Sequence, residues 1–500
     1  MRSQLKRLGS DTAIYGISTI LGRALNFLLL PFYTNVLLPG DYGIVSYLFS
    51  IIAFVNVLYS YGMESSYFKY SSTLEIGTKK QNFGTPFTAL LVSSVTFSAI
   101  IALAAGPIAG ALNIASNVGS LVTIAAGVLA CDAIAIVPFA ALRMEHKPRV
   151  FATIKFVTIA ITVVMNILLL VVAKMGVTGI FLSNLIASAS AVVMLIPTIR
   201  RNFSFDVNAP LLKALLRFGL PFIPAGLATM AVQVIDRPIL RALTDDATVG
   251  IYQANYRLGI FMMLVVQMYD FAWRPFYFSN AGAPNAKELF ARVLTYFALF
   301  MSGIFLAVSF FIDELVKIHV AGHYIIHPNY WGGLGIVPIV LGGYMFLGIS
   351  NNMSAGIYIQ KKTSYMPPIA FVGAFVNIAA NVLLIPSMGM VGAAWATFLA
   401  YLAMACMMYI IVRRIYPVPY EFGRLAKIFG AAAIAYIGGL LVQADGLSFG
   451  WRMGAKVAVL LLFAGLMFIM RFFEPREMAF IRGMFNRPTV EGPDVDTNLL

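Results

Sequence analysis

Fourteen apolar runs of about 20 residues constrain the fold of this chain more than any other feature, because each is long enough to cross a bilayer as a helix. A soluble domain has about a quarter charged residues, whereas this chain is 11% charged and 60% hydrophobic, with a mean hydropathy of +0.85. The chain is therefore predicted to be an all-α integral membrane protein with about 14 transmembrane helices. The predicted spans are approximately 10–37, 42–62, 83–106, 118–142, 151–173, 176–199, 217–242, 248–275, 289–312, 330–352, 366–386, 388–412, 425–443 and 453–471.

The positive charges predict the orientation. If the N-terminus is cytoplasmic and the spans alternate, the inner segments hold 25 Lys or Arg residues and the outer loops hold 5. This bias is the positive-inside rule, so both termini are predicted to be cytoplasmic. The net charge of +14 does not indicate nucleic acid, because the basic residues lie in short loops between the spans rather than on one face.

The chain also contains an internal repeat with an offset near 210 residues. Asn166 and the following Met175-Gly176-Val-Thr-Gly179 recur as Asn381 and Met388-Gly389-Met-Val-Gly392, and Gly43-Ile44 has a weaker echo in Gly250-Ile251. Two bundles of six spans that both start in the cytoplasm are parallel repeats, related by an axis along the membrane normal. We predict two parallel six-helix bundles at 1–199 and 217–412, a cytoplasmic linker at 200–216, two additional helices within 413–471 and a cytoplasmic tail at 472–500.

Ionisable side chains within the spans are costly in a bilayer, and therefore mark candidate functional positions. The eighth predicted span is the most informative, since one arc of about 140° carries its polar, aromatic and basic residues. The candidate substrate-binding residues are Arg23, Arg257, Arg237, Arg274, Tyr252, Tyr256 and Gln267, and the candidate ion-coupling residues are Asp132 and Asp236.

Each charged candidate also has a structural interpretation. Arg23 and Arg257 lie in mid-span, where contact with a substrate is favoured over a structural ion pair. Asp236 and Arg237 are adjacent and point about 100° apart on a helix, so structural pairs with other helices are as plausible as a substrate role. Asp132 could bind a coupling cation, but a hydrogen-bonded core carboxyl is the favoured interpretation.

Two further basic residues lie near the cytoplasmic face. Arg274 and Lys155 are within about a turn of it, where a long side chain reaches the interface by default. Asp270, one turn from Arg274, would neutralise it.

No signature of an enzyme is present. The chain has no G-x-x-x-x-G-K-[ST] phosphate loop and no HExxH or CxxC motif. His319, His323 and His327 have a spacing that could bind a metal, but Gly322 and Pro328 interrupt the segment, so an exposed outer loop is favoured. We expect no enzymatic activity, no cofactor and no metal site.

Several stretches resemble the oligosaccharide-lipid flippases of polysaccharide biosynthesis (Wzx-type), within the multidrug/oligosaccharidyl-lipid/polysaccharide exporter superfamily. They are Asn26 to Pro31, Gly40-Asp41-Tyr42-Gly43, Gly219-Leu-Pro221 through Ile235-Asp236-Arg237, Val249-Gly250-Ile251-Tyr252 and Trp273-Arg274-Pro275-Phe276. The resemblance covers about residues 8–470 and is a diffuse pattern that identifies a family better than a substrate. A lipid II-type flippase and a cation-coupled small-molecule exporter of the same superfamily remain alternatives.

The resemblance implies a secondary transporter of the bacterial inner membrane that moves a polyprenyl-diphosphate-linked oligosaccharide from the cytoplasmic to the outer leaflet. It implies a lipid-linked oligosaccharide and membrane lipids as partners, with a polysaccharide polymerase and a chain-length regulator as further candidates and no nucleic acid. Arginine suits such a head group, because its planar fork bonds two phosphate oxygens at once.

Overall fold

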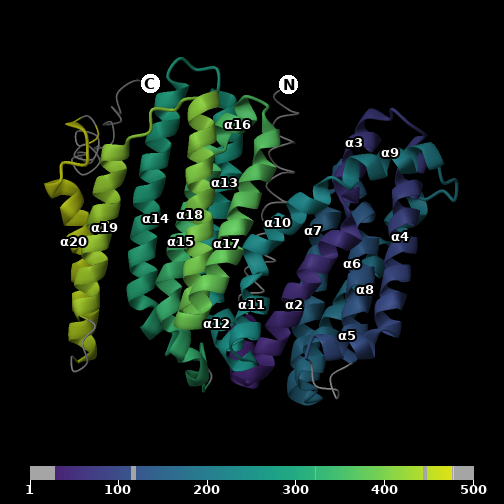
Figure 1. Ribbon diagram of the computed structural model, residues 1–500, viewed down its shortest axis with the longest axis horizontal. Coiled ribbons are helices and arrows are strands. Elements are labelled where there is room, and N and C mark those ends of the chain that lie inside the picture. Colours follow the sequence, from purple (N-terminus) through teal and green to yellow (C-terminus); the bar gives the residue numbers. More distant parts are fainter. Residues whose placement is uncertain (1–28, 114–119, 321, 443–447, 476, 478–500) are drawn as a thin grey trace, which may run out of the picture. The chain divides into compact units, whose positions relative to one another are not determined.

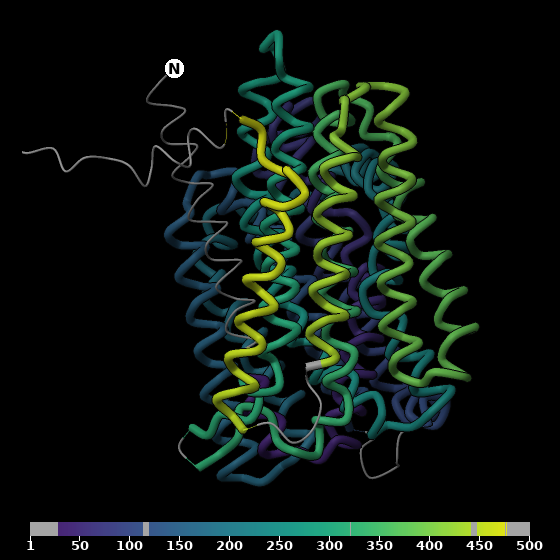
Figure 2. Tube along the Cα trace, turned by 90° about the vertical axis from the view of Figure 1, so that its left-hand side faces the viewer, coloured from purple at the N-terminus to yellow at the C-terminus, as the bar shows by residue number. Residues whose placement is uncertain are grey.

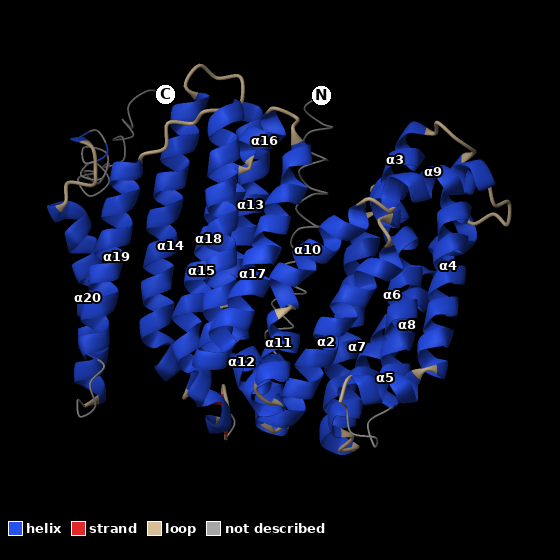
Figure 3. Cartoon of the chain, in the orientation of Figure 1, coloured by secondary structure: helices blue, strands red, loops and turns tan. Residues whose placement is uncertain are grey.

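The structure is a computed structural model of the chain that describes residues 29–113, 120–320, 322–442, 448–475 and 477. These residues are helical almost throughout (Figure 3). The strands among them form one short antiparallel pair, β1 (His319–Val320) and β2 (His323–Tyr324).

The helices of the first half follow in the order α2 (Pro39–Ser60), α3 (Met63–Thr73), α4 (Lys79–Leu103), α5 (Ala105–Ala111), α6 (Ser120–Met144), α7 (Pro148–Asn166), η2 (Ile167–Val172), α8 (Gly176–Asn202) and α9 (Ala209–Gly219). The second half contains α10 (Phe222–Val234), α11 (Asp236–Leu243), α12 (Asp246–Leu258), α13 (Ile260–Asn280), α14 (Ala286–Val316), η3 (Pro328–Ile336), α15 (Val337–Met353), α16 (Ala355–Ile359), η4 (Thr363–Tyr365), α17 (Met366–Met388), α18 (Met390–Ile415), α19 (Phe422–Val442) and α20 (Phe449–Ile469).

Thirteen of the fourteen predicted spans have a counterpart among the described residues. Twelve helices are long and apolar enough to cross a membrane, and α12 and α13 form a thirteenth span if the pair, bent by 40°, is counted as one. The predicted first span, 10–37, lies mostly outside the described residues; its end, 29–36, is helical.

Local sequence signals explain where several helices begin and end. Thr78 and Gln81 form a capping box at the start of α4. The Asn208 and Asp245 side chains accept hydrogen bonds from the backbone at the starts of α9 and α12. Gly389 follows α17 with a φ of +54°, a conformation that favours glycine.

The chain divides into two compact units, residues 1–286 with 312–418 and residues 287–311 with 419–500. In the first unit, α2, α4, α6, α7 and α8 pack together, and α10, α15, α17 and α18 form a second group (Figure 1). A buried aromatic cluster with Tyr67, Phe83 and Phe87 joins α3, α4 and α9. The predicted domain boundaries stay a prediction.

The second unit combines the central part of α14 with α19 and α20, which run side by side (Figure 2). Ion pairs tie its helix ends together, with Arg424 Nη2 3.0 Å from Glu477 Oε2 and Arg292 Nη2 2.9 Å from Glu474 Oε1. Burial raises the pKa of Glu477, but hydrogen bonds from Tyr296, the Glu474 backbone and Arg424 outweigh it, so this pKa lies below its ordinary value. The carboxylate is therefore charged at neutral pH.

The repeated motifs have matching local geometry. Asn166 and Asn381 are both fully buried, and each donates from Nδ2 to the carbonyl four residues earlier, at 2.7 and 2.8 Å. Gly176 and Gly389, which open the next helix of each half, have φ angles of +55° and +54°. This agreement supports the duplication, and superposition of the whole bundles stays a prediction.

The two halves contact each other at Gly43 and Gly250, which belong to the weaker of the two repeated motifs. A Cβ atom on Gly43 of α2 would lie 1.7 Å from the Asp246 carbonyl oxygen, and one on Gly250 of α12 would lie 1.9 Å from the Pro39 carbonyl oxygen. The starts of α2 and α12 therefore touch backbone to backbone (Figure 1), as small residues permit in membrane helices. We call this contact the glycine crossing.

Hydrogen bonds between the halves surround the glycine crossing. Tyr330 Oη donates to the Leu37 carbonyl at 2.9 Å, and Asn35 Nδ2 donates to the Tyr324 carbonyl at 2.7 Å. Arg241 pairs with Asp246 at 2.5 Å and also donates to the carbonyls of Leu112 and Asn113, at 2.6 and 3.1 Å. The chain is thus tightly closed at this end of the first unit.

Replacing Gly250 by Ala should destabilise the protein, because the new methyl group meets backbone that cannot rotate away. Overpacking of this kind costs about 1–3 kcal/mol, occasionally more. The measurement is thermal unfolding of the purified protein in detergent, with Gly40→Ala as the control, since a Cβ at Gly40 has no neighbour within 4 Å. Equal melting temperatures for the two variants would contradict the close approach described here.

Candidate functional site

A cavity of about 600 Å³ lies beside the glycine crossing, with walls from both halves of the repeat. Four of the predicted substrate-binding residues line it: Arg237, Tyr256, Arg257 and Gln267. We call it the arginine cavity. Its full lining is Tyr33, Tyr42, Val45, Phe49, Thr162, Ile180, Asn184, Gln233, Val234, Arg237, Tyr256, Arg257, Ile260, Met263, Val266, Gln267, Tyr344, Leu347, Asn351 and Tyr401.

A bend in the predicted eighth span shapes this cavity. The axes of α12 and α13 differ by 40°, with Gly259 between them. A Cβ on Gly259 would lie 2.5 Å from a Val340 methyl group, so glycine lets the bend pack closely against α15. The bend leaves Arg257 and Gln267, on either side of it, in the same cavity wall.

Asp236 and Arg237 form a closed polar cluster at the edge of the cavity. Both are buried, with 2% and 5% of their surfaces exposed, and Arg237 Nη1 lies 2.6 Å from Asp236 Oδ1. Asp236 Oδ2 accepts a hydrogen bond of 2.5 Å from Tyr252 Oη, and Arg237 Nε donates to Gln253 Oε1 at 2.9 Å. The Asp236 charge is therefore satisfied within the protein.

The sequence interpretation did not include this pairing. It placed the two side chains about 100° apart, with structural pairs to other helices as plausible as a substrate role. The chain breaks between α10 and α11 at Ile235, and Asp236 lies in the first turn of α11. The long Arg237 side chain folds back from α11 and pairs with the adjacent Asp236. Its guanidinium also lies 4.5 Å from the centre of the Tyr256 ring, a favourable cation–π distance.

Arg257 has a different environment. It lines the arginine cavity, forms no ion pair with a described residue, and its Nη1 is buried without a hydrogen-bond partner among them. Its guanidinium carbon is 5.8 Å from the centre of the Tyr42 ring. The described lining includes two arginines and no carboxylate, and only Arg237 is neutralised. A buried donor without a partner is costly, so this cavity is suited to an anion.

Two of the predicted residues, Tyr252 and Arg274, are described and do not line the cavity. Tyr252 is fully buried, and its hydroxyl donates a hydrogen bond to Asp236. Arg274 has a side chain that is 59% exposed and pairs with Asp270 at 2.8 Å, as expected for residues one turn apart. Arg23 lies outside the described residues. Roles in substrate binding for all the candidates stay predictions.

Several lining residues were not singled out from the sequence. They are the tyrosines Tyr33, Tyr42, Tyr344 and Tyr401 and the polar residues Thr162, Asn184 and Asn351. Tyr344 Oη donates to Tyr256 Oη at 3.2 Å, which holds the Tyr256 ring in place. Isolated polar residues on apolar helices are common, so only the fold distinguishes these from others.

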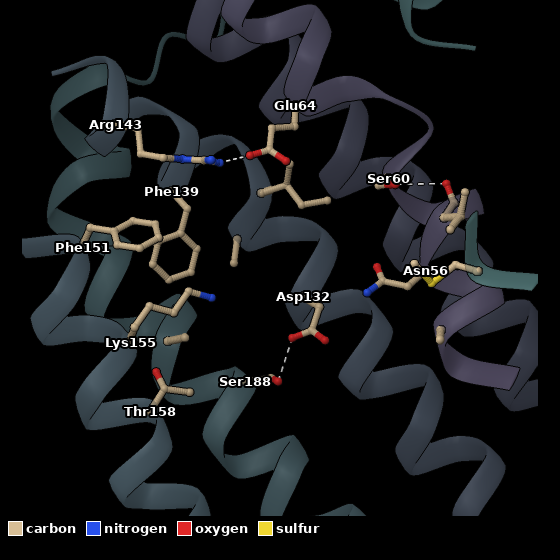
Figure 4. Close-up of a pocket in the computed structure, with 16 residues that line it drawn as sticks. Asn56, Ser60, Glu64, Asp132, Phe139, Arg143, Phe151, Lys155, Thr158 and Ser188 are labelled. Carbon is tan, nitrogen blue, oxygen red and sulfur yellow. Dashed lines mark hydrogen bonds and ion pairs between the residues drawn. The ribbon is translucent and has the colours of Figure 1, made fainter. Parts of the chain in front are cut away.

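A second cavity, of about 580 Å³, contains Asp132 (Figure 4). Ser188 Oγ donates to Asp132 Oδ1 at 2.8 Å, and the Lys155 ammonium lies 4.3 Å from the centre of the Phe139 ring. We call it the lysine cavity. Its lining is Ala53, Asn56, Val57, Ser60, Glu64, Asp132, Ala135, Ile136, Phe139, Arg143, Phe151, Lys155, Thr158, Ser188, Ala191 and Met230.

The histidine segment forms a small hairpin at the surface. His319 and His323 are exposed on β1 and β2, and His327 precedes η3. The described residues contain no group of three His, Cys, Asp or Glu side chains that could hold a metal.

A family model described as "Polysaccharide biosynthesis protein" matches residues 34–325, more than half of the chain. The chain belongs to this family. The match covers both cavity-forming arginines, Lys155, Asp132 and the glycine crossing. A comparison with curated proteins found no match.

Solved structures with a similar fold are membrane transporters. The lipid II flippase MurJ in an inward closed conformation has a TM-score of 0.71 at 15% identity, over 92% of this chain and 100% of that one. An inward-facing multidrug resistance MATE family transporter of the MOP superfamily has a TM-score of 0.59 at 13% identity, over 79% of this chain and 95% of that one. The D35N mutant of the Vibrio cholerae MATE transporter VcmN has a TM-score of 0.55 at 14% identity, over 82% and 96%.

These comparisons confirm two predictions. The family model supports the predicted resemblance to a family of polysaccharide biosynthesis, and the structural matches support the predicted all-α fold. The chain is a multi-pass, all-α membrane protein, with 12 or 13 candidate spans among its described residues and a fold similar to that of these transporters. At such low identity, the structural likeness establishes the fold and leaves the substrate open.

Replacing Asp236 by Asn should destabilise the protein strongly, because Arg237 would remain buried with its charge uncompensated. Breaking a buried pair in this way costs about 3–5 kcal/mol. Thermal unfolding in detergent measures the effect, and Asp270→Asn is the matched control, since an exposed i,i+4 pair contributes about 0.3–0.5 kcal/mol. A stability loss no larger than that of the control would mean that Arg237 is solvated.

Proposed function

We propose that this protein is a flippase that moves a polyprenyl-diphosphate-linked oligosaccharide from the cytoplasmic to the outer leaflet for surface polysaccharide synthesis. One observation carries the proposal: in the arginine cavity, the guanidinium of Arg257 has no carboxylate partner among the described residues. Membership of a polysaccharide biosynthesis family supports it. The protein would act as a transporter and not as an enzyme.

The cavity has the chemistry that a diphosphate requires. Arginine bonds two phosphate oxygens at once through its planar fork. The surrounding hydroxyl and amide groups, among them Tyr42, Tyr256 and Gln267, can satisfy the remaining oxygens. The apolar lipid tail would stay in the bilayer, since the cavity has no need to enclose it.

The membrane potential could drive the movement without a nucleotide. Carrying a negative charge outward across an inside-negative membrane is favourable by about 2.3 kcal/mol per charge per 100 mV. A diphosphate with a charge near −2 would gain roughly 4–5 kcal/mol per 100 mV. Coupling to an ion through Asp132 is a further proposal, whereas the pairing of Asp236 with Arg237 makes that carboxylate less available.

The closed glycine crossing would face the outside of the cell. This assignment follows the predicted orientation, in which both termini are cytoplasmic and the protein lies in the bacterial inner membrane. The described state would then receive its substrate from the cytoplasmic side. A polysaccharide polymerase and a chain-length regulator are proposed as partners that act on the delivered lipid.

An exporter of cationic small molecules is the principal alternative. It would need a carboxylate-centred site between the halves, and the arginine cavity has none among its described lining residues. A lipid II-type flippase would share the diphosphate and differ in the sugars, so Arg257 alone does not separate it from the proposed function.

Replacing Arg257 by Ala should abolish delivery of the lipid-linked sugar to the outer leaflet, and Arg257→Lys should retain part of it, because an ammonium loses the two-pronged geometry. We expect the same for Arg23, whose predicted role lies outside the described residues. The measurement is surface polysaccharide in a flippase-null strain, at matched protein levels in the membrane.

Arg200→Ala is the control for this experiment, since Arg200 is exposed at the end of α8 and lines neither cavity. It should complement the strain fully. Full complementation by both Arg257→Ala and Arg23→Ala would contradict the proposed mechanism.

A further inference from the structure

The arginine cavity and the lysine cavity follow one another along the same helices. On α7 the lining passes from Thr162 to Thr158, on α8 from Asn184 to Ser188, and on α10 from Gln233 to Met230. Each step is three or four residues, which is one helical turn. The two cavities are therefore consecutive sections of one lumen.

Helix α2 gives the order of these sections. Tyr42, Val45 and Phe49 line the arginine cavity near the glycine crossing, and the same helix continues through Ala53 and Asn56 along the lysine cavity. The lysine cavity thus lies further from the closed end. A head group held at Arg257 and entering from the opposite end would extend through it.

The charged groups of the lysine cavity are suited to a neutral or polar ligand rather than to a phosphate. Figure 4 shows Lys155 and Asp132 on facing walls, with their polar ends directed into the cavity. Among the described residues, Asp132 accepts one hydrogen bond, from Ser188, and the Lys155 ammonium lies over the Phe139 ring without an ion pair. Arg143 and Glu64 also line this cavity and pair with each other. Its two cations and two carboxylates therefore balance, and this section has no excess of positive charge, unlike the arginine cavity.

The remaining walls combine hydrogen-bonding groups with aromatic rings. Asn56, Thr158 and Ser188 contribute an amide and two hydroxyl groups, and Phe139 and Phe151 pack edge to face with ring centres 5.3 Å apart. Sugars need this mixture, because each hydroxyl can donate to a carboxylate and accept from an ammonium, while the apolar C–H faces of the ring pack against aromatic surface.

We propose that the lysine cavity is a glycan subsite, in which Asp132 and Lys155 bind the sugar residues next to the diphosphate while Arg257 holds the diphosphate itself. The inference rests on the proposed function and deepens it. Lys155 lines the lysine cavity and Thr162 lines the arginine cavity. They are seven residues apart on α7, about 10 Å at 1.5 Å per residue, a distance that a short glycan can span.

The test compares two probes on the purified full-length protein in lipid nanodiscs. One is undecaprenyl diphosphate without sugar, and the other is undecaprenyl diphosphate bearing a disaccharide. Binding is measured by native mass spectrometry and by titration of the intrinsic tryptophan fluorescence. The variants are Lys155→Gln, Asp132→Asn and Arg257→Gln, with Lys174→Gln as the control, because Lys174 is exposed and lines neither cavity.

We expect Lys155→Gln and Asp132→Asn to weaken binding of the glycosylated lipid about tenfold, as loss of a hydrogen bond to a charged group does, and to leave the sugar-free lipid within about twofold. Arg257→Gln should weaken both probes equally, and Lys174→Gln neither. Thermal unfolding of each variant separates loss of binding from loss of folding, and a folded Lys155→Met serves if Lys155→Gln is unstable.

Two outcomes would overturn the glycan subsite alone. One is equal binding of both probes by the unmodified protein, and the other is a Lys155 variant that leaves the glycosylated lipid unaffected or weakens both probes equally. In each case sugar-free lipid still bound through Arg257 would leave the proposed function standing. If the unmodified protein bound neither probe, the proposed function would fail and the subsite with it.

Discussion

The backbone contact at Gly43 and Gly250 is the constraint on which the rest of the first unit depends. An added methyl group on either residue would lie less than 2 Å from a carbonyl oxygen of the other helix, so α2 and α12 can meet there only without side chains. This contact brings equivalent positions of the two repeats together and closes one end of the lumen. Tyr42 immediately precedes Gly43 on α2, and Arg257 follows Gly250 on α12, so the crossing also brings both side chains to the arginine cavity.

Near this closed end, one arginine is neutralised, and the other has no ion-pair partner among the described residues. Asp236 and Tyr252 hold Arg237 in a buried network, which costs desolvation and gives a rigid wall. Arg257 has no such partner among the described residues. Because an unpaired buried cation is unfavourable, an anionic head group would be stabilised there. Further along, Lys155 and Asp132 together add no net charge. In the proposed mechanism, the lumen would therefore change from binding phosphate to binding sugar along its length.

Much of the fold could be predicted from the sequence because membrane insertion is governed by local hydrophobicity, which identified thirteen spans that the structure also has. The candidate site could be predicted less completely. The periodicity of one straight helix placed Arg257 and Arg274 on a common stripe, but the bend at Gly259 leaves only Arg257 in the cavity. The break at Ile235 allowed Asp236 and Arg237 to pair. Lys155 and Asp132 come from different helices, and only tertiary packing brings them to one cavity. The sequence showed that Gly43-Ile44 recurs as Gly250-Ile251, but it did not show that the two glycines are in contact.

The account's central claim is that one lumen holds the whole head group, with the diphosphate at Arg257 and the sugars towards Lys155. An electron cryomicroscopy structure of the full chain in nanodiscs with undecaprenyl diphosphate disaccharide tests it most directly. The account predicts diphosphate density within hydrogen-bonding distance of the Arg257 guanidinium and sugar density between Asp132 and Lys155. Head-group density outside the lumen, or reversed along it with the sugars at Arg257, would contradict the account.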